Sequence, residues 1–206
     1  MNNLKVVLIG GGGFSYELGH MLSENGVEIV GIISKNKPQY NFKYNYLGGD
    51  DCISRWIEIP MAIAIGNPIL RGKLHEKIVS CGGSLFSFVH PTAYVSATAK
   101  LSEGVIIYPN STVHAGVCLR DNVFVNSNVS ISHETIVGIN TIISPGSSIG
   151  GASIVGSECY IGLGSCILEG IKISNGVTIG GGAMVVRDCL SPNNTYVGIP
   201  AKLMKS

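Results

Sequence analysis

A histidine and a glutamate stand side by side in a stretch that is otherwise built mainly from small, apolar and amide residues. They are His133 and Glu134, within the segment NSNVSISHETIVG at 126–138. An imidazole can take a proton from a reacting amine or hydroxyl near neutral pH, and an adjacent carboxylate can orient the ring. The pair is therefore a candidate general base. The alternative is an ordinary structural histidine at a polar corner of the fold.

An aliphatic residue recurs at every sixth position around this pair, from Val89 to Val185. The 17 hexads run without exception or insertion, and the residue four places after each aliphatic is small in 16 of them. A period of six over so many repeats is the signature of a hexapeptide parallel β-helix. Three hexads form one triangular coil, so the sequence predicts a prism of about six coils.

The corners of such a prism have their own pattern. Three residues after each aliphatic, Gly or Asn occupies 11 of the 17 positions. Both residues adopt a positive φ at low cost, which a sharp corner requires. Glu134 falls in this slot and breaks the local rule, as functional residues often do. Glu158 and Asp188 occupy the same slot, which favours the alternative that corners simply tolerate solvent-facing acids.

Residues 1–88 follow a different pattern, in which strand and helix signals alternate. Short apolar runs predict buried strands at 5–10, 27–33 and 61–66. Apolar spacing and terminal Pro or Gly predict helices at 14–26 and 68–83. This alternation is typical of a small parallel sheet with flanking helices, a Rossmann-like α/β domain.

The two patterns divide the chain into an α/β domain, a β-helix and a C-terminal tail. We expect these parts at 1–88, 89–188 and 189–206. The glycines after the first strand can cradle a phosphate at a helix N-terminus. As a dinucleotide fingerprint they fail, because Ser15 replaces the third glycine and no acid follows the second strand.

Composition excludes several classes of protein. The chain has 14 Lys and Arg against 13 Asp and Glu, so nucleic acid is not an expected partner. No apolar run reaches the ~18 residues of a membrane span. Six cysteines without a C-x-x-C pair predict a reduced protein of the cytoplasm. Residues 89–188 hold only 4 basic and 6 acidic residues, which favours burial of the prism walls between subunits.

Seven segments, taken in order, resemble the bacterial sugar acetyltransferases of the bacillosamine and sialic-acid (PglD/NeuD) type, in the hexapeptide-repeat acyltransferase superfamily. They are IGGGG at the first strand, IGNPILRGKL (65–74), FVHPTAYVS (88–96), NSNVSISHETIVG (126–138), SPGSSIGG (144–151), IGGGAMVVRD (179–188) and YVGIPAKLM (196–204). The resemblance covers essentially the whole chain. It implies a left-handed β-helix, acetyl-CoA as co-substrate, no metal, and a homotrimer with active sites between neighbouring prisms.

The resemblance also implies roles for single residues. His133 matches the general base, and Glu134 matches the acid that orients it and raises its basicity. Acetyl-CoA is implied to contact Ile142, Gly151, Leu163 and Gly181. The sugar or nucleotide sugar is implied to contact Gly11, Gly12, Gly13, Phe14, Ser34, Lys35, Gly66 and Asn126. Many relatives carry His at the positions of Phe14 and Ile142 and an Asp pair at Ser34 and Lys35, so the acceptor is expected to differ.

We therefore predict acetyl transfer from acetyl-CoA to the 4-amino group of a nucleotide-activated amino-deoxysugar, for a surface glycan. One alternative is O-acetylation of a sialic-acid-like sugar, which the loss of the Asp pair favours. Another is a non-catalytic trimeric scaffold that binds a sugar nucleotide, which the intact His–Glu pair disfavours. A β-helix carbonic anhydrase would need three zinc-binding histidines with a pair five apart, and His114 has no such partner.

Overall fold

The computed structural model describes residues 4–38 and 43–204, which form two compact units. The first unit comprises Met1–Gly66 and Leu70–Ser87, and the second comprises Asn67–Ile69 and Phe88–Ser206. Within the described ranges, no helix is both long and apolar enough to cross a membrane.

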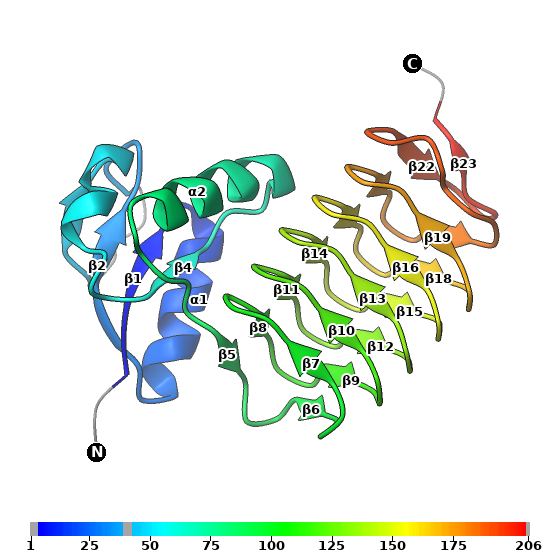
Figure 1. Ribbon diagram of the computed structural model, residues 1–206, viewed down its shortest axis with the longest axis horizontal. Helices are drawn as coiled ribbons and strands as arrows, with labels where there is room; N and C mark the ends of the chain where they lie inside the picture. Colours follow the sequence, from blue (N-terminus) through cyan, green and yellow to red (C-terminus); the bar gives the residue numbers. More distant parts are fainter. Residues whose placement is uncertain (1–3, 39–42, 205–206) are drawn as a thin grey trace. The chain divides into compact units, whose positions relative to one another are not determined.

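The first unit is built on a four-stranded parallel sheet with the strand order β3-β2-β1-β4 (Figure 1). Its strands are β1 (Lys5–Ile9), β2 (Glu28–Ile33), β3 (Tyr46–Gly48) and β4 (Met61–Ile63). The helices are α1 (Gly13–Glu24), the 3-10 helix η1 (Asp50–Arg55) and α2 (Pro68–Ser80). The Rossmann-like prediction is confirmed. No sequence pattern predicts β3 and η1. Strand β3 has only three residues and ends in glycine, so it lacks the apolar run by which a buried strand is recognised.

The second unit is the predicted β-helix, a prism whose three walls are parallel sheets of very short strands (Figure 1). The β7 wall contains β7 (Lys100–Leu101), β10 (Cys118–Leu119), β13 (Ile136–Val137), β16 (Ile154–Val155) and β19 (Lys172–Ile173). The β6 wall contains β6 (Tyr94–Val95), β9 (Thr112–Val113), β12 (Ser130–Ile131), β15 (Ser148–Ile149), β18 (Cys166–Ile167) and β21 (Met184–Val185). The β5 wall contains β5 (Phe88–Val89), β8 (Ile106–Ile107), β11 (Phe124–Val125), β14 (Ile142–Ile143), β17 (Tyr160–Ile161), β20 (Thr178–Ile179), β22 (Thr195–Val197) and β23 (Lys202–Leu203).

Every strand from β5 to β21 ends on one of the aliphatic residues of the hexad pattern. These side chains point inward and form most of one continuous core. The small residues of the neighbouring slot also face inward, and several carry hydroxyl groups. Thr135 Oγ1 donates to the carbonyl of Gly150 at 3.1 Å, and Ser147 Oγ donates to the carbonyl of Gly162 at 2.8 Å. These short hydroxyl side chains therefore tie one coil to the next and satisfy their own buried polar groups.

The predicted corner conformation is confirmed. Every sixth residue from Gly104 to Gly182 has a positive φ, and Glu134 (58°) and Glu158 (56°) adopt it although they are neither Gly nor Asn. Beyond the last hexad, β22 pairs in parallel with β20, and β23 pairs antiparallel with β22. The C-terminal residues therefore extend the β5 wall.

The six-residue register makes a test possible with two isoleucines that lie close in sequence. Ile131 is fully buried in the core, whereas Ile136 points outward from β13 and is 37% exposed. We expect Ile131→Asp to lower the free energy of unfolding by at least about 3 kcal/mol, because it buries an unpaired carboxylate. Ile136→Asp is the matched control and should keep a folded prism. Circular dichroism during chemical denaturation measures both, and equal curves for the two variants would contradict the register.

Candidate active site

His133 and Glu134 lie at the corner where the chain passes from β12 in the β6 wall to β13 in the β7 wall. We call this the His133 edge; it contains the corner residues that follow each strand of the β6 wall. The backbone there is held by the adjacent coils. The amide of Glu134 donates to the carbonyl of Ala115 at 2.9 Å, and the amide of Ala152 donates to the carbonyl of His133 at 2.8 Å. The pair is therefore presented on a fixed backbone.

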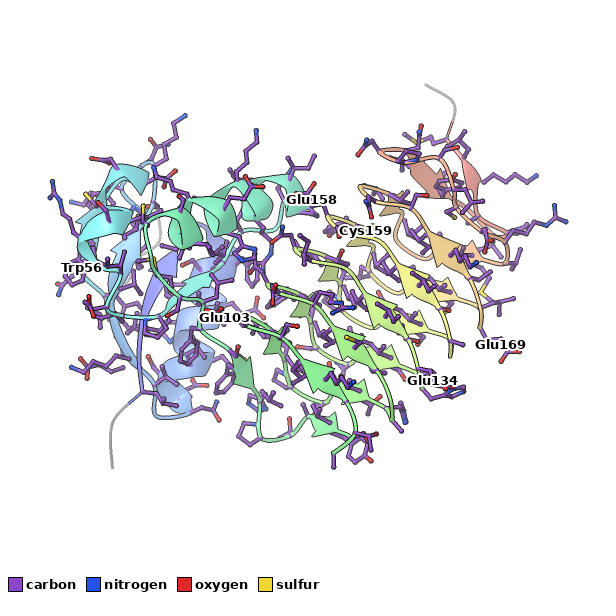
Figure 2. All side chains as sticks on the ribbon, in the orientation of Figure 1. Trp56, Glu103, Glu134, Glu158, Cys159 and Glu169 are labelled. Carbon is purple, nitrogen blue, oxygen red and sulfur yellow. The ribbon has the colours of Figure 1, made fainter. Side chains whose placement is uncertain are left out.

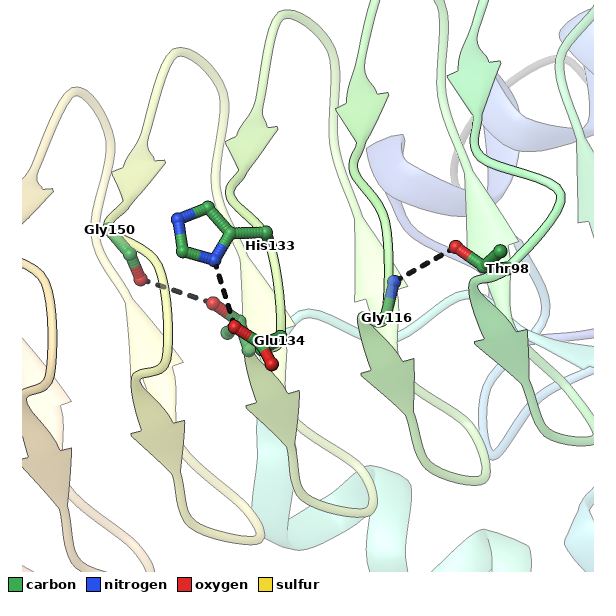
Figure 3. A network of polar contacts seen from close by, with 6 residues as sticks. Thr98, Gly116, His133, Glu134 and Gly150 are labelled. Carbon is green, nitrogen blue, oxygen red and sulfur yellow. Dashed lines mark hydrogen bonds and ion pairs between the residues drawn. The ribbon is translucent and has the colours of Figure 1, made fainter.

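The imidazole and the carboxylate contact each other directly (Figure 3). His133 Nδ1 lies 3.3 Å from Glu134 Oε2, and the two side chains are 62% and 74% exposed. An ionised carboxylate only accepts hydrogen bonds, so Nδ1 carries the proton in this contact. The lone pair of Nε2 is then free to accept a proton from a substrate. Both side chains are open to an incoming ligand.

The imidazole lies directly over Gly151. A Cβ atom at this position would lie 2.5 Å from Nε2 and 2.6 Å from Cε1 of His133, distances that real side chains do not show. The ring therefore occupies the space above Gly151, one coil beyond its own backbone. This gives Gly151 a structural role beside the imidazole, while its predicted contact with acetyl-CoA stays a prediction.

A cavity of about 590 Å³ opens beside the imidazole, within the usual size range of small-molecule sites. It is lined by His133 and Gly151 together with Ser132, Gly150, Ile167, Leu168, Glu169, Ile171 and Val186. Most of this lining is apolar or bare backbone. Glu169 is the acid among the lining residues, and no sequence motif marks it. It lies 36 residues after His133, which is two coils along the same edge.

Four other predicted residues lie elsewhere on the prism. Asn126, Leu163 and Gly181 lie on the edge between the β5 and β6 walls, which we call the Asn126 edge. Leu163 is 62% exposed there, and a Cβ on Gly181 would lie 3.3 Å from its carbonyl oxygen. Ile142 lies in β14 between Phe124 and Tyr160 and is only 4% exposed. Within one chain, none of the four lines the cavity beside His133.

The first unit holds a second cavity of about 420 Å³ at the carboxyl ends of its strands. It is lined by Ile9, Gly10, Gly11, Ser34, Lys35, Asn36, Lys37, Asp50, Ile65, Leu70 and Leu74. The structure thus brings together Gly11, Ser34 and Lys35, whose contact with a substrate stays a prediction. Gly12, Gly13, Phe14 and Gly66 are not among the lining residues. The absence of a side chain on Gly11 allows close packing, since a Cβ there would lie 2.8 Å from Ser34 Oγ.

Asp50 is the acid of this second cavity, and no local sequence signal marks it. It follows β3 at the start of η1, whereas the dinucleotide pattern places an acid at the end of β2. Strand β3 pairs with β2, so the carboxyl ends of both strands reach the same edge of the sheet. The neighbouring Asp51 is exposed and does not line the cavity.

The described side chains do not form an obvious metal-binding site. In the ranges 4–38 and 43–204, no group of three or more His, Cys, Asp or Glu residues could hold a metal ion. His114, the histidine closest in register to His133, packs against Tyr94 with ring centroids 6.2 Å apart.

Residues 5–78 match the family described as the PglD N-terminal domain. In structure, the chain is similar to a histidine variant of perosamine N-acetyltransferase from Caulobacter crescentus in complex with CoA and GDP-perosamine. The TM-score is 0.92 at 27% identity, over 98% of this chain and 97% of that one. It is also similar to the acetyltransferase domain of PglB from Neisseria gonorrhoeae in complex with acetyl coenzyme A, with a TM-score of 0.90 at 27% identity over 98% and 100%.

A third likeness shows the fold alone. WeeI from Acinetobacter baumannii aligns with a TM-score of 0.84 at 20% identity, over 97% of this chain and 99% of that one. No curated protein matches the chain by sequence. The likeness to the first two structures extends over both units. The sequence match to the PglD N-terminal domain lies within the same aligned region. The chain is therefore an acyltransferase, and over nearly its whole length it resembles the sugar acetyltransferases of the hexapeptide-repeat superfamily.

Proposed function

We propose that the protein transfers the acetyl group of acetyl-CoA to the 4-amino group of a nucleotide-activated amino-deoxysugar, as a step in surface-glycan biosynthesis. One observation carries the proposal: His133 Nδ1 contacts Glu134, while Nε2 lies over Gly151 beside a cavity of about 590 Å³. The likeness to an N-acetyltransferase in complex with CoA and GDP-perosamine supports the acyl donor and the class of acceptor.

In the proposed reaction, His133 Nε2 takes a proton from the amine as its nitrogen attacks the thioester carbonyl carbon. The tetrahedral intermediate collapses with cleavage of the carbon–sulfur bond, and His133 returns the proton to the sulfur of CoA. Amine and acetyl-CoA thus give amide and CoA thiol without a covalent acyl-enzyme. Glu134 keeps the ring in the tautomer that leaves Nε2 unprotonated, and its charge stabilises the imidazolium that forms.

We infer that a homotrimer completes the site, because one chain holds the predicted residues on different edges. His133 and Gly151 lie on the His133 edge, whereas Asn126, Leu163 and Gly181 lie on the Asn126 edge. The outward residues in the middle of the β6 and β7 walls carry no charge; they are Thr112, Ser130, Ser148, Cys166, Cys118, Ile136 and Ile154. Uncharged walls of this kind suit contact between prisms, which would bring one edge of each chain against the other edge of its neighbour.

The cytoplasm remains the expected location, because all six cysteines are free thiols. Burial raises the pKa of Cys159 to about 11, and burial followed by the charge of Asp188 raises the pKa of Cys189 to about 11. Both thiols therefore stay protonated and unreactive in the core.

The function is tested by thiol release from acetyl-CoA with a panel of UDP-, dTDP- and GDP-linked 4-amino-deoxysugars and free sialic acids. We expect wild-type turnover with one or more nucleotide-linked amino sugars. His133→Ala should lower kcat by about 10²–10⁴-fold, because it removes the general base. Glu134→Gln should cost less, because it removes only the group that orients the ring. Unchanged melting temperatures provide the control, and wild-type kcat in His133→Ala would falsify the assignment.

The trimer makes a prediction about mixed variants. We expect Asn126→Ala and His133→Ala each to be poorly active alone. Trimers that contain both kinds of chain should recover activity, because one interface then pairs an intact His133 with an intact Asn126. Activity of the co-expressed, tandem-purified mixture measures this recovery. A monomer mass by light scattering, or no recovery in a mixed trimer, would contradict a site shared between chains.

The cavity of the first unit makes a prediction about nucleotide binding. Lys35 and Lys37 can pair with phosphates, and we expect the Asp50 carboxylate to accept hydrogen bonds from the ribose hydroxyls. Asp50→Asn should then weaken binding of the preferred nucleoside diphosphate, among GDP, UDP and dTDP, by about tenfold. Asp51→Asn, the exposed neighbour, is the matched control and should bind as wild type. Calorimetric titration measures both, and equal affinities for the two variants would remove Asp50 from the site.

A further inference from the structure

Glu169 lines the cavity that contains His133, and the proposed reaction does not use it. It is an exposed corner residue of the His133 edge. Within the described part of the chain, no ion pair or hydrogen bond engages its carboxylate, and the salt bridges found there join Lys5 to Glu28 and His133 to Glu134. A carboxylate of this kind, beside a candidate base, is available to a substrate.

The register of the coils places Glu169 just beyond the imidazole. The ring of His133 already lies over Gly151, on the next coil. The amide of Gly170 donates to the carbonyl of Gly151 at 2.8 Å, so Glu169 lies on the coil after that. Stacked strands are about 4.8 Å apart, so the backbone of Glu169 lies about one coil spacing beyond that of Gly151, over which the ring lies. Figure 2 shows Glu134 and Glu169 on successive parts of the same edge.

A side chain that starts one coil beyond the ring, in the same cavity, can serve as a second acceptor for a group bonded to His133 Nε2. Two hydrogen bonds of about 2.9 Å that meet at a tetrahedral nitrogen hold their acceptor atoms about 4.7 Å apart. A primary amine carries two N–H donors and one lone pair. When one N–H points to His133 Nε2 and the other points to Glu169, the lone pair is left for attack on the thioester carbon. A hydroxyl carries a single O–H and satisfies only one of the two acceptors.

We propose that Glu169 accepts a hydrogen bond from the second N–H of the acceptor, and so makes this enzyme selective for amino sugars over sugar hydroxyls. The inference rests on the proposed acetyl transfer and decides between N- and O-acetylation at the same site. The proton on the first N–H passes to Nε2 and then to the sulfur of CoA. The second proton remains on the amide product, which still contacts Glu169. A hydroxyl acceptor has no second donor for Glu169, so it gains nothing from the carboxylate.

The test compares acceptor pairs that differ in one group: each 4-amino-deoxysugar nucleotide of the panel and its 4-hydroxyl counterpart. Glu169→Leu should lower kcat/KM for the amine tenfold or more and leave that for the hydroxyl unchanged, so the selectivity ratio falls by the same factor. The KM for acetyl-CoA and the melting temperature should stay at wild-type values. Glu158→Leu, a corner acid on another edge outside the cavity, is the matched control and should keep the wild-type ratio.

A second variant separates the hydrogen bond from the charge. Glu169→Gln keeps an acceptor oxygen and the shape of the side chain, so it should retain most of the selectivity even where the leucine variant is poorly folded. A loss in Glu169→Gln as large as in Glu169→Leu would overturn the assignment. An equal fall for amine and hydroxyl, or a raised KM for acetyl-CoA alone, would also overturn it.

Failure of the proposed function has a different outcome. In that case wild type releases no thiol with any panel member, and the role of Glu169 falls with it. If wild type acetylates amines but Glu169→Leu keeps the wild-type ratio, the proposed function stands and only this inference is wrong.

Discussion

Backbone pairing between residues 18 apart is the constraint on which the rest of the prism depends. Val125 pairs with Ile143, and the same offset is repeated along all three walls from β5 to β20. Because the offset is constant, each slot of the hexad stacks on the same slot of the next coil. The coils are packed closely at some corners: a Cβ on Gly150 or Gly162 would lie 2.4 Å from backbone of the following coil. One coil therefore cannot shift along the next. Side chains 18 residues apart lie above one another and form columns along the prism.

One of these columns builds the site. His133, Gly151 and Glu169 occupy the same slot on three successive coils. The missing side chain at Gly151 leaves room for the imidazole, and Thr135 ties the adjoining corner through the carbonyl of Gly150. The backbone thus positions an imidazole whose side chain is largely exposed. Such a group is both accurately placed and open to a ligand, as the proposed role of general base requires.

The success and the failures of sequence-based prediction have a common physical reason. The hexads carry a local signal that is repeated 17 times, so strands, corners and core are predictable from that signal alone. Asp50 has no such signal, because its place in the cavity depends on the pairing of β3 with β2. Glu169 lies two whole coils after His133 and therefore in the same slot of the repeat. It is still not predicted, because nothing in the sequence distinguishes it from the other acidic residues at corners. Asn126 and Leu163 are predicted to belong to the site only through the family resemblance. Neither residue lines the cavity beside His133 within one chain.

The positions that depart from the related enzymes lie away from the His133 column. Phe14, Ser34 and Lys35 belong to the first unit, and Ile142 belongs to the β5 wall. An outward side chain on a wall can change without disturbing the stacked backbone, so such positions can vary while the His133 column is kept. Ile142 carries no hydrogen-bond donor on its side chain, so it can offer a ligand only an apolar contact. These positions thus lie apart from the column of His133, Gly151 and Glu169, whose alignment comes from the constant offset of the coils.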